Sequence, residues 1–423
     1  MCYYNLVLKK RGVAQLVERV VWDHEVARSI RVTPTNIKRN YLEIGSSFFA
    51  YSRLKNKRIY DKIITALNNY KEDFMVAIET MKKSRWRKLK ILFAVLLCFS
   101  IFLTGCSEEQ TGEFLDILLE AFFESIMNPQ QDVVNVEGEM TVHFIDVGQA
   151  DATLFVQNGH SMLFDAATKN RGDELVEYIK NLGIEYIDVL ILSHHHDDHM
   201  GGAAEVLNNI EVGTVYGPDI FDISSLDSIG WYSDMIEAVD KIDQERNKNV
   251  PIDAQTSIWQ LPRNNKGEFA KFNIGEAIVE FYAPLEDEYT DKNDYSICAK
   301  VTFGTVDILL TGDATTSVET ALIAEGYDLD IEIFQAGHHG SDTSNSKEFL
   351  KAMSPECIVI SCGMKNKYNH PVKSIIELYK KMDIPVYRTD ESGDIIMTTD
   401  GTKYSFDKEP GTYTSGEEYK NGG

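Results

Sequence analysis

The chain has 423 residues, which allows two or three domains, and a formal net charge of −24. Residues 1–105 carry 20 Lys and Arg against 8 Asp and Glu, whereas residues 106–423 carry 22 against 58. A region this acidic attracts cations and lacks the basic surface that sequence-reading nucleic-acid binding needs, so that class of function is disfavoured.

The first 105 residues predict processing signals. Residues 1–80 resemble peptides obtained when a tRNA gene is translated in error, so we interpret them as a miscalled upstream extension; a genuine basic segment is the alternative. Residues 81–105 join a basic stretch to an apolar run at 91–104 that is too short for an ordinary transmembrane helix. The run Leu-Thr-Gly-Cys ending at Cys106 resembles the lipobox of bacterial lipoproteins. This resemblance implies a signal peptide cut before Cys106 and a lipid on its thiol; an uncut anchor is the alternative.

Residues 106–139 predict a tether. Apolar residues recur at helical spacing over 113–128, which indicates an amphipathic helix that packs on the domain or lies on the membrane. The tail at 406–423, rich in Gly and Glu, predicts a flexible acidic segment. Buried free thiols are the favoured interpretation of the remaining cysteines, with a disulfide as the alternative in an exported protein: Cys298, Cys357 and Cys362.

Residues 140–405 predict one continuous α/β domain, a sandwich with its sites at strand ends. Apolar runs of strand length lie at 141–145, 152–156, 161–164, 187–192, 213–216, 277–282, 296–302, 306–310, 330–335 and 357–361. Helical patterns lie at 173–182, 203–208, 232–247, 317–325 and 347–353.

The run Leu-Ser-His-His-His-Asp-Asp-His-Met-Gly-Gly at 192–202 is the strongest chemical signal. It contains His194, His196, Asp198 and His199 in the pattern His-x-His-x-Asp-His, between an apolar strand and a helical pattern. Strand-to-helix loops are where α/β folds place their sites. Imidazoles with carboxylates suit zinc, manganese or iron. The alternative is a histidine-rich surface run.

Two further signals follow later strands. Thr-Gly-Asp ends at Asp313, directly after the strand at 306–310, and this carboxylate is a candidate bridge between two metal ions. His338 and His339 follow the strand at 330–335. Adjacent histidines on one loop do not easily bind the same ion, so we expect one to ligate and the other to face substrate.

Together these runs resemble the metallo-β-lactamase superfamily, and within it the hydrolase domain of ComEC-type competence proteins. The resemblance covers 140–402, and its matching pieces follow the family's order: 144–151, 193–202, 293–296, 310–314, 337–341 and 368–371. It implies a four-layer αβ/βα sandwich with one or two divalent cations, Zn²⁺ or Mn²⁺, at one edge of the two sheets. The channel segments of ComEC have no counterpart that we identify here, so a channel role is not carried over.

The resemblance also implies a ligand set. His194 and His196 would hold one ion, Asp198, His199 and His338 the second, and Asp313 would bridge them. His339 and His370 are candidates for the general acid that protonates the leaving group, and Asp165 would fix a ligand histidine. The remaining expected pocket residues are Asp146, Gln149, Asp151, Asn293, Ser296 and Ser341.

One departure concerns the first ion. Many members of the superfamily supply a further histidine from the region before the bridging Asp, but residues 200–312 contain none. Solvent, Asn293 or Ser296 would then complete the site, and such an oxygen-rich site favours manganese.

These inferences predict a membrane-anchored extracellular hydrolase in which a metal-bound hydroxide attacks a phosphodiester, most simply DNA. A phosphodiesterase acting on choline or teichoic polymers of the cell envelope is the first alternative, and the acidic charge favours it. A non-catalytic lipoprotein with a vestigial metal site is the second. No protein partner is indicated beyond the membrane contact through Cys106.

Overall fold

The computed structural model describes residues 136–218 and 230–421. The predicted signal peptide, Cys106 and the helix expected over 113–128 lie outside these residues, and the boundaries expected before residue 136 stay predictions. None of the helices in the two described ranges combines the length and apolarity that crossing a bilayer requires.

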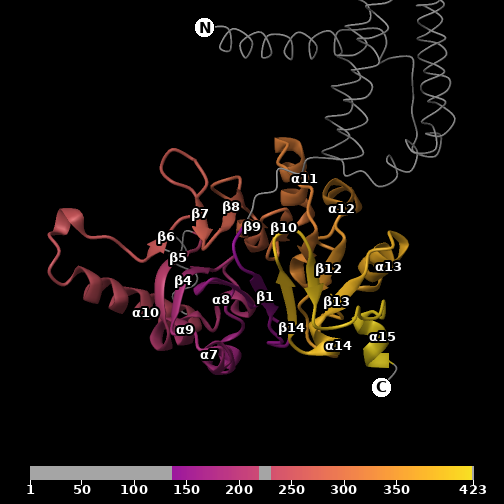
Figure 1. Cartoon of the computed structure of the whole chain (residues 1–423), viewed down its shortest axis with the longest axis horizontal. Coiled ribbons are helices and arrows are strands. Elements are labelled where there is room, and N and C mark those ends of the chain that lie inside the picture. Colours follow the sequence, from indigo (N-terminus) through magenta and orange to yellow (C-terminus); the bar gives the residue numbers. More distant parts are fainter. Residues whose placement is uncertain (1–135, 219–229, 422–423) are drawn as a thin grey trace, which may run out of the picture. The chain divides into compact units, whose positions relative to one another are not determined.

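Two β-sheets form the centre of the domain (Figure 1). The first comprises, in spatial order, β15 (Tyr404–Phe406), β14 (Ile395–Thr399), β1 (Met140–Phe144), β2 (Thr153–Gln157), β3 (His160–Phe164), β4 (Tyr186–Ile191), β5 (Glu211–Tyr216) and β6 (Trp259–Gln260). The second comprises β13 (Val386–Arg388), β12 (Cys357–Ile360), β11 (Ile333–Gln335), β10 (Val306–Leu310), β9 (Cys298–Phe303), β8 (Ala277–Ala283) and β7 (Lys271–Ile274).

Each sheet is antiparallel in one part and parallel in the other. In the first, β3, β4, β5 and β6 run parallel; in the second, β10 to β13 do. Loops that leave the carboxyl ends of neighbouring parallel strands meet at one edge of a sheet, which is where α/β folds form their sites. The chemical signals of the sequence follow β3, β4, β10 and β11.

Helices cover the outer face of each sheet (Figure 1). The first sheet is covered by α7 (Gly172–Asn181), α9 (Ala203–Asn209) and α10 (Gly230–Asn247). The second is covered by α11 (Thr316–Glu325), α12 (Lys347–Met353) and α13 (Lys373–Lys381). Two short helices lie in connections, α8 (Asp197–Met200) and α14 (Thr389–Ser392), and a third, α15 (Gly416–Asn421), follows the last strand. The predicted four-layer αβ/βα sandwich is confirmed.

Strand alternation builds the layers. Successive side chains of a strand point to opposite faces of the sheet. In β2, Leu154 packs in the core under the first set of helices, whereas Phe155 packs in the core between the sheets. In β10, Leu309 faces the second set of helices, and Ile308 and Leu310 face the first sheet. Three apolar cores therefore separate the four layers.

The structure departs from the sequence predictions at two places. The strand expected over 296–302 begins only at Cys298, and Ser296 ends a short 3-10 helix instead. The tail expected to be flexible is ordered over 406–421: Tyr404–Phe406 is a strand, and Ser415 is fully buried. Within the described residues the three cysteines are buried free thiols, as predicted.

Candidate metal centre

The His-rich run leaves the carboxyl end of β4 and enters the single turn α8. His194 and His196 precede this turn and His199 lies within it, so their side chains converge. His194 Nε2 lies 2.9 Å from His196 Nδ1, and the ring centroids of His194 and His199 are 4.3 Å apart. His194 and His199 are fully buried, whereas the side chain of Asp198 is 25% exposed.

Asp165, directly after β3, holds this loop in place through hydrogen bonds. Its carboxylate accepts hydrogen bonds from the backbone N–H of Ser193 (2.7 Å), from the Ser193 hydroxyl (2.8 Å) and from His199 Nδ1 (2.7 Å). Because Nδ1 of His199 is engaged, its Nε2 is the atom left to bind a metal. Partners of this kind orient the ring and select its tautomer, which is the role expected for Asp165.

We predict that Asp165→Asn lowers metal affinity by about 10–100-fold, because the imidazole of His199 loses its carboxylate acceptor. Asparagine tolerates the left-handed backbone of this residue (φ 62°). The matched control is Asp188→Asn, because Asp188 also accepts from a histidine Nδ1 (His160) and from a serine N–H (Ser161) but lies away from the cluster. Titration against a chelator measures the affinity. Equal losses in the two variants would contradict the prediction.

Asp313 enters from the second sheet, at the end of β10. Gly312 has φ 50°, and a Cβ there would lie 2.8 Å from Ser193 Oγ, so glycine is needed where the two loops meet. The Asp313 N–H donates to Ser296 Oγ at 3.1 Å. Oδ1 of Asp313 lies 3.1 Å from His199 Nε2, and Oδ2 lies 3.6 Å from His194 Nε2. The carboxylate of Asp313 thus faces both His194 and His199.

His338 and His339 lie side by side after β11, both in the left-handed region (φ 52° and 54°). His339 is buried, its Nδ1 donates to the carbonyl of Ser361 at 3.0 Å, and its Nε2 lies 3.5 Å from Asp198 Oδ2. His338 is 23% exposed, and its Nε2 lies 3.3 Å from Asp313 Oδ2. This placement differs from the prediction, in which His338 joined Asp198 and His199: His339 takes that position. The side to which each ring turns depends on the backbone of this turn, which the sequence does not reveal.

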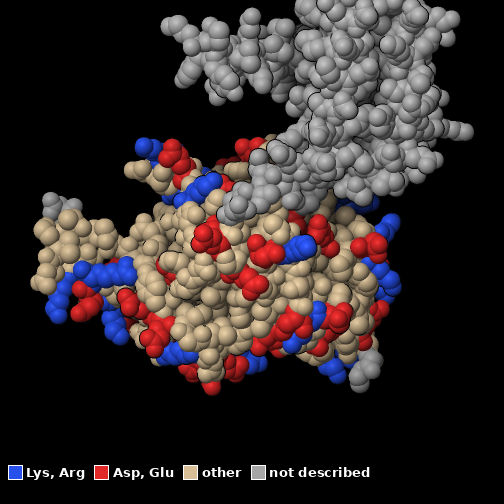
Figure 2. Space-filling view, in the orientation of Figure 1, with Lys and Arg blue, Asp and Glu red and all other residues tan. Residues whose placement is uncertain are grey.

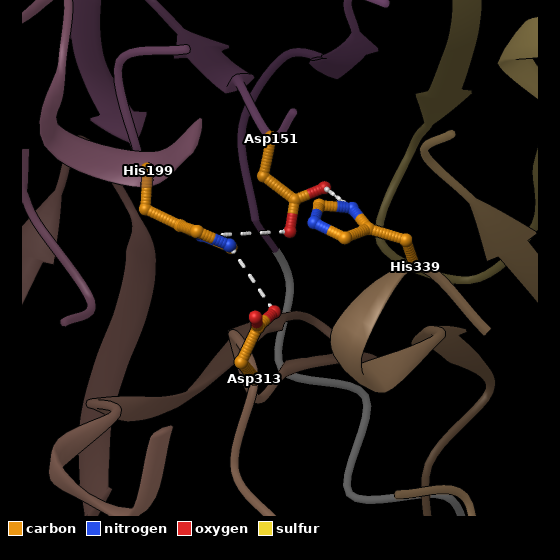
Figure 3. A group of neighbouring side chains, drawn as sticks. All are labelled: Asp151, His199, Asp313 and His339. Atoms are coloured by element: carbon orange, nitrogen blue, oxygen red, sulfur yellow. Dashed lines mark ion pairs between the residues drawn. The ribbon is translucent and has the colours of Figure 1, made fainter. Parts of the chain in front are cut away.

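The side chains form two groups of potential ligands that share Asp313. One contains Asp151, His199, Asp313 and His339, all buried (Figure 3). The other contains His194, His196 and Asp313. A shared carboxylate with one oxygen toward each group fits the bridging role predicted for Asp313.

In the group that contains His199 and His339, Asp151 lies on the Nδ1 side of both rings. Its oxygens lie 3.8 Å from His199 Nδ1 and 3.6 Å from His339 Nδ1, and both of these nitrogens already donate hydrogen bonds elsewhere. The Nε2 atoms face Asp313 and Asp198 instead. We therefore assign the second set of ligands to His199, His339, Asp198 and Asp313, with Asp151 orienting the two imidazoles.

Unpartnered polar atoms mark the same place. His199 Nε2, His339 Nε2 and Asp313 Oδ1 are among the buried polar atoms of the described residues that form no well-aligned hydrogen bond, although His199 Nε2 and Asp313 Oδ1 lie 3.1 Å apart. Buried polar groups are almost always hydrogen-bonded, and three convergent exceptions require an explanation. A divalent cation supplies one, since imidazole nitrogens and carboxylate oxygens are ligands of Zn²⁺ and Mn²⁺. The donor set therefore fits the metals that the fold implies.

Comparison with known proteins agrees with this geometry. The family model described as the metallo-beta-lactamase superfamily matches residues 145–363, which is more than half of the chain and contains both groups of ligands. The chain belongs to the metallo-β-lactamase superfamily. It is a metal-dependent hydrolase of that superfamily, related to competence proteins.

Curated relatives of this superfamily member include a competence protein and a ComE operon protein. The chain is 29% identical over 261 residues to Competence protein ComA of Neisseria gonorrhoeae (61% of this chain, 32% of the relative) and 24% identical over 297 residues to ComE operon protein 3 of Bacillus subtilis (66% and 34%). The chain thus spans about a third of the length of the curated relatives it matches. Among solved structures, the metallo-β-lactamase fold protein YhfI from Bacillus subtilis is 13% identical with a TM-score of 0.40, covering 62% of this chain and 100% of YhfI.

Opposite charges face one another in the metallo-β-lactamase centre. Burial opposes the charged form of Asp313, but the neighbouring His199 and His194 hold the pKa of its carboxyl well below the usual range. Burial likewise lowers the pKa of His199 and His339, but the carboxylates Asp313 and Asp165 around His199, and Asp151 and Asp198 around His339, raise both pKa values well above 6.5. In the metal-free protein at pH 7 these two imidazoles therefore carry the positive charge that a divalent cation would replace.

We predict that metal binding at pH 7 releases about two protons, one from each of His199 and His339, because ligand imidazoles must be neutral. Both pKa values are raised, so the protonated fraction falls, and metal affinity rises, as the pH increases from 6 toward the pKa values of the folded protein. Calorimetry in two buffers of different ionisation enthalpy measures the proton count. Identical binding heats in the two buffers would show that the rings are neutral before the metal arrives.

The other predicted pocket residues lie in different surroundings. Gln149 Nε2 donates to His370 Nδ1 at 3.3 Å, and Ser341 Oγ lies 3.1 Å from Thr343 Oγ1. Asp146 is exposed and accepts from the N–H of Gly148, which stabilises a turn outside the cluster. Asn293 lies in the 3-10 helix before Ser296, where its N–H donates to the side chain of Asp291 and its carbonyl accepts from the N–H of Ser296. The sequence analysis missed residues that act through the ligands: Ser193, Thr343, Gln335 and Ser361.

Proposed function

We propose that the chain hydrolyses phosphodiesters of nucleic acid. The observation that carries this proposal is a rigid loop at 363–371 that holds an exposed aromatic ring and a lysine beside the metal centre. The ring of Tyr368 is 49% exposed and stacks on His370, with centroids 5.5 Å apart, and the ring of His370 lies 6.1 Å from that of His339. Lys367 Nζ lies 4.6 Å from the centre of the Tyr368 ring.

Asn366 makes this loop rigid. Its side-chain amide donates to the carbonyls of Gly363 and His370, and its side-chain oxygen accepts from the N–H groups of Tyr368 and His370. An aromatic ring held in one position binds a nucleobase by stacking at little entropic cost. A neighbouring ammonium suits the phosphate of the same nucleotide.

Lys367 is exposed and interacts with Tyr368. Its contact with the Tyr368 hydroxyl and, further off, the Asp198 carboxylate raise the pKa of the Lys367 ammonium. On the face shown in Figure 2, Lys and Arg side chains lie between Asp and Glu side chains and do not gather into one broad basic surface. A surface without a broad basic area fits a site that handles one phosphodiester at a time, and not one that reads long stretches of duplex.

Each group has a defined part in the reaction. Divalent cations bound here would supply an activated water nucleophile and polarise the phosphoryl oxygen. Asp313 and the histidines would position them, and Lys367 would neutralise the phosphate. His370 was a candidate general acid, but burial and the neighbouring His339 and His338 lower its pKa to about 3. Its imidazole is therefore neutral at pH 7 and suits substrate positioning, through Gln149 and Tyr368, better than proton donation.

A choline or teichoic phosphodiester of the cell envelope is the second candidate. The 58 acidic against 22 basic residues after residue 105 favour it, because this charge attracts a cationic head group and repels DNA. The names of the competence relatives agree with the nucleic-acid candidate, although the chain spans only part of those proteins. We further propose that Cys106 is lipidated and holds the domain at the outer face of a bacterial membrane.

The test compares substrates on the purified chain with added Mn²⁺ or Zn²⁺. We expect cleavage of single-stranded DNA, and we expect Tyr368→Ala to weaken DNA binding about tenfold because it removes one stacking contact. Tyr186→Ala, which removes a similarly exposed tyrosine (45%) from the start of β4, is the control and should bind as wild type does. Turnover of a choline phosphodiester alone would overturn the nuclease proposal. Absence of both metal and turnover would leave only the vestigial-site alternative.

A further inference from the structure

The group of ligands that contains His194 and His196, here called the first group, lacks a third histidine. His194 and His196 contribute two nitrogens, and Asp313 contributes one oxygen that is shared with the second group. Zinc sites in proteins have at least three protein ligands, and residues 200–312 contain no histidine that could supply another. His194, His196 and the shared Asp313 meet this minimum, so a third histidine ligand would have to come from a different part of the fold.

His338 lies at the open side of this group. Its Nε2 is 3.3 Å from Asp313 Oδ2, the same oxygen that lies 3.6 Å from His194 Nε2. By contrast, His199 of the second group faces the other oxygen, Oδ1, at 3.1 Å. His199 thus faces one oxygen of Asp313, Oδ1, whereas His338 and His194 both face the other, Oδ2.

The second nitrogen of His338 is already engaged. Nδ1 lies 2.9 Å from the hydroxyl of Thr343, which in turn lies 3.1 Å from Ser341 Oγ. The contact with Thr343 fixes the ring and leaves Nε2 directed at Asp313, as the partners of ligand histidines do elsewhere. Thr343 is therefore a positioning residue for this imidazole.

The backbone supports a functional role for both histidines of this turn. Two consecutive non-glycine residues with left-handed φ are unfavourable, and such conformations persist where the surrounding structure holds them for a purpose. The N–H of His338 donates to the carbonyl of Gly312 at 3.0 Å, which ties the turn to the loop that carries Asp313. This conformation turns His339 to Asp198 and His338 to Asp313 Oδ2.

We propose that His338 is the third histidine ligand of the ion held by His194, His196 and Asp313, in place of the histidine that is absent from 200–312. Adjacent histidines would then serve different ions, His338 the first and His339 the second, across the shared carboxylate of Asp313. The proposal rests on the metal-binding part of the proposed function and is independent of the substrate.

The test is the metal content and affinity of His338→Gly in the purified full chain. Glycine accepts a left-handed φ without strain, so this variant removes the imidazole and keeps the turn. We expect elemental analysis to give two Mn²⁺ or Zn²⁺ per wild-type chain and one per variant chain. Added free imidazole should restore the second ion, because it can occupy the space that the side chain leaves. His160→Ala, which removes an exposed ring at the start of β3 that pairs with Asp188, should keep both ions.

The outcomes separate the two proposals. If His338→Gly binds as many ions as wild type with unchanged affinity, His338 is not a ligand, whatever the activity. If the loss of metal is not restored by imidazole while circular dichroism shows a changed fold, Thr343→Val decides: an unchanged affinity for the more weakly held ion overturns the assignment, and a decrease supports it. A wild-type chain that binds no metal at all overturns the proposed function itself.

Discussion

Asp313→Asn is expected to reduce hydrolysis on the order of 10³-fold and to lower the metal content of the chain. The substitution replaces a carboxylate, which faces His199 with one oxygen and His194 and His338 with the other and is predicted to bridge two ions, by a neutral amide. A metal ion contributes several kcal/mol of transition-state stabilisation, and about 1.4 kcal/mol corresponds to tenfold in rate. Loss of correct binding of both ions therefore accounts for a factor of this size.

The measurement combines initial rates on a phosphodiester with elemental analysis of the same preparation. Asp342→Asn is the control, since Asp342 is exposed and follows the same histidine turn. It changes charge by the same amount and should leave rate and metal content unaltered. A variant of Asp313 that keeps two ions and at least a tenth of the wild-type rate would show that this carboxylate does not bridge.

The strand pattern and the His-x-His-x-Asp-His run allowed much of the centre to be predicted. Apolar runs such as those of β4 and β10 are buried from both sides, so their sequence alone indicates where they end and where the following polar residue must lie. His194, His199 and Asp313 are brought together as expected. Each of these residues directly follows a strand or sits in a strand-to-helix loop, and the fold brings such loops to one edge.

The histidine pair shows where sequence reasoning stops. Whether His338 or His339 turns to Asp198 depends on two backbone angles in a turn of a few residues, and nothing in the local composition specifies them. The supporting polar residues were missed for a related reason. Gln335 and Ser361 lie in or beside apolar strands. Gln335 donates to Asp151, and it also donates to the Ser361 hydroxyl because β11 and β12 are neighbours in the sheet.

The tail after residue 405 was expected to be flexible because it is polar and rich in glycine. The structure anchors it through contacts that are distant in sequence. The N–H of Gly416 donates to the carbonyl of Pro371, and Lys420 Nζ donates to Asn369 Oδ1 at 2.7 Å. The tail therefore packs on the loop that carries Tyr368 and His370, and its attachment bears on the site.

Arg388 is the residue that fastens this tail, and its loss should be the most destabilising single change at a charged side chain outside the metal centre. The guanidinium is fully buried; Nε and NH2 donate to Asp390 at 3.0 and 2.8 Å, and Glu391 lies 3.1 Å away. The same group donates to the tail carbonyls of Thr412 and Thr414.

We predict that Arg388→Met lowers the free energy of unfolding by about 3–5 kcal/mol, because it leaves Asp390 and Glu391 buried without their cation. In a domain of this size that corresponds to a fall in Tm of about 10 °C. Arg171→Met is the matched control: Arg171 also pairs with a glutamate three residues on, Glu174, but both side chains are exposed (45% and 61%), so about 0–1 kcal/mol is expected. Chemical denaturation measures both variants. Equal small losses would mean that the cost of burying the guanidinium cancels its ion pairs, and the tail would then be held by its backbone contacts alone.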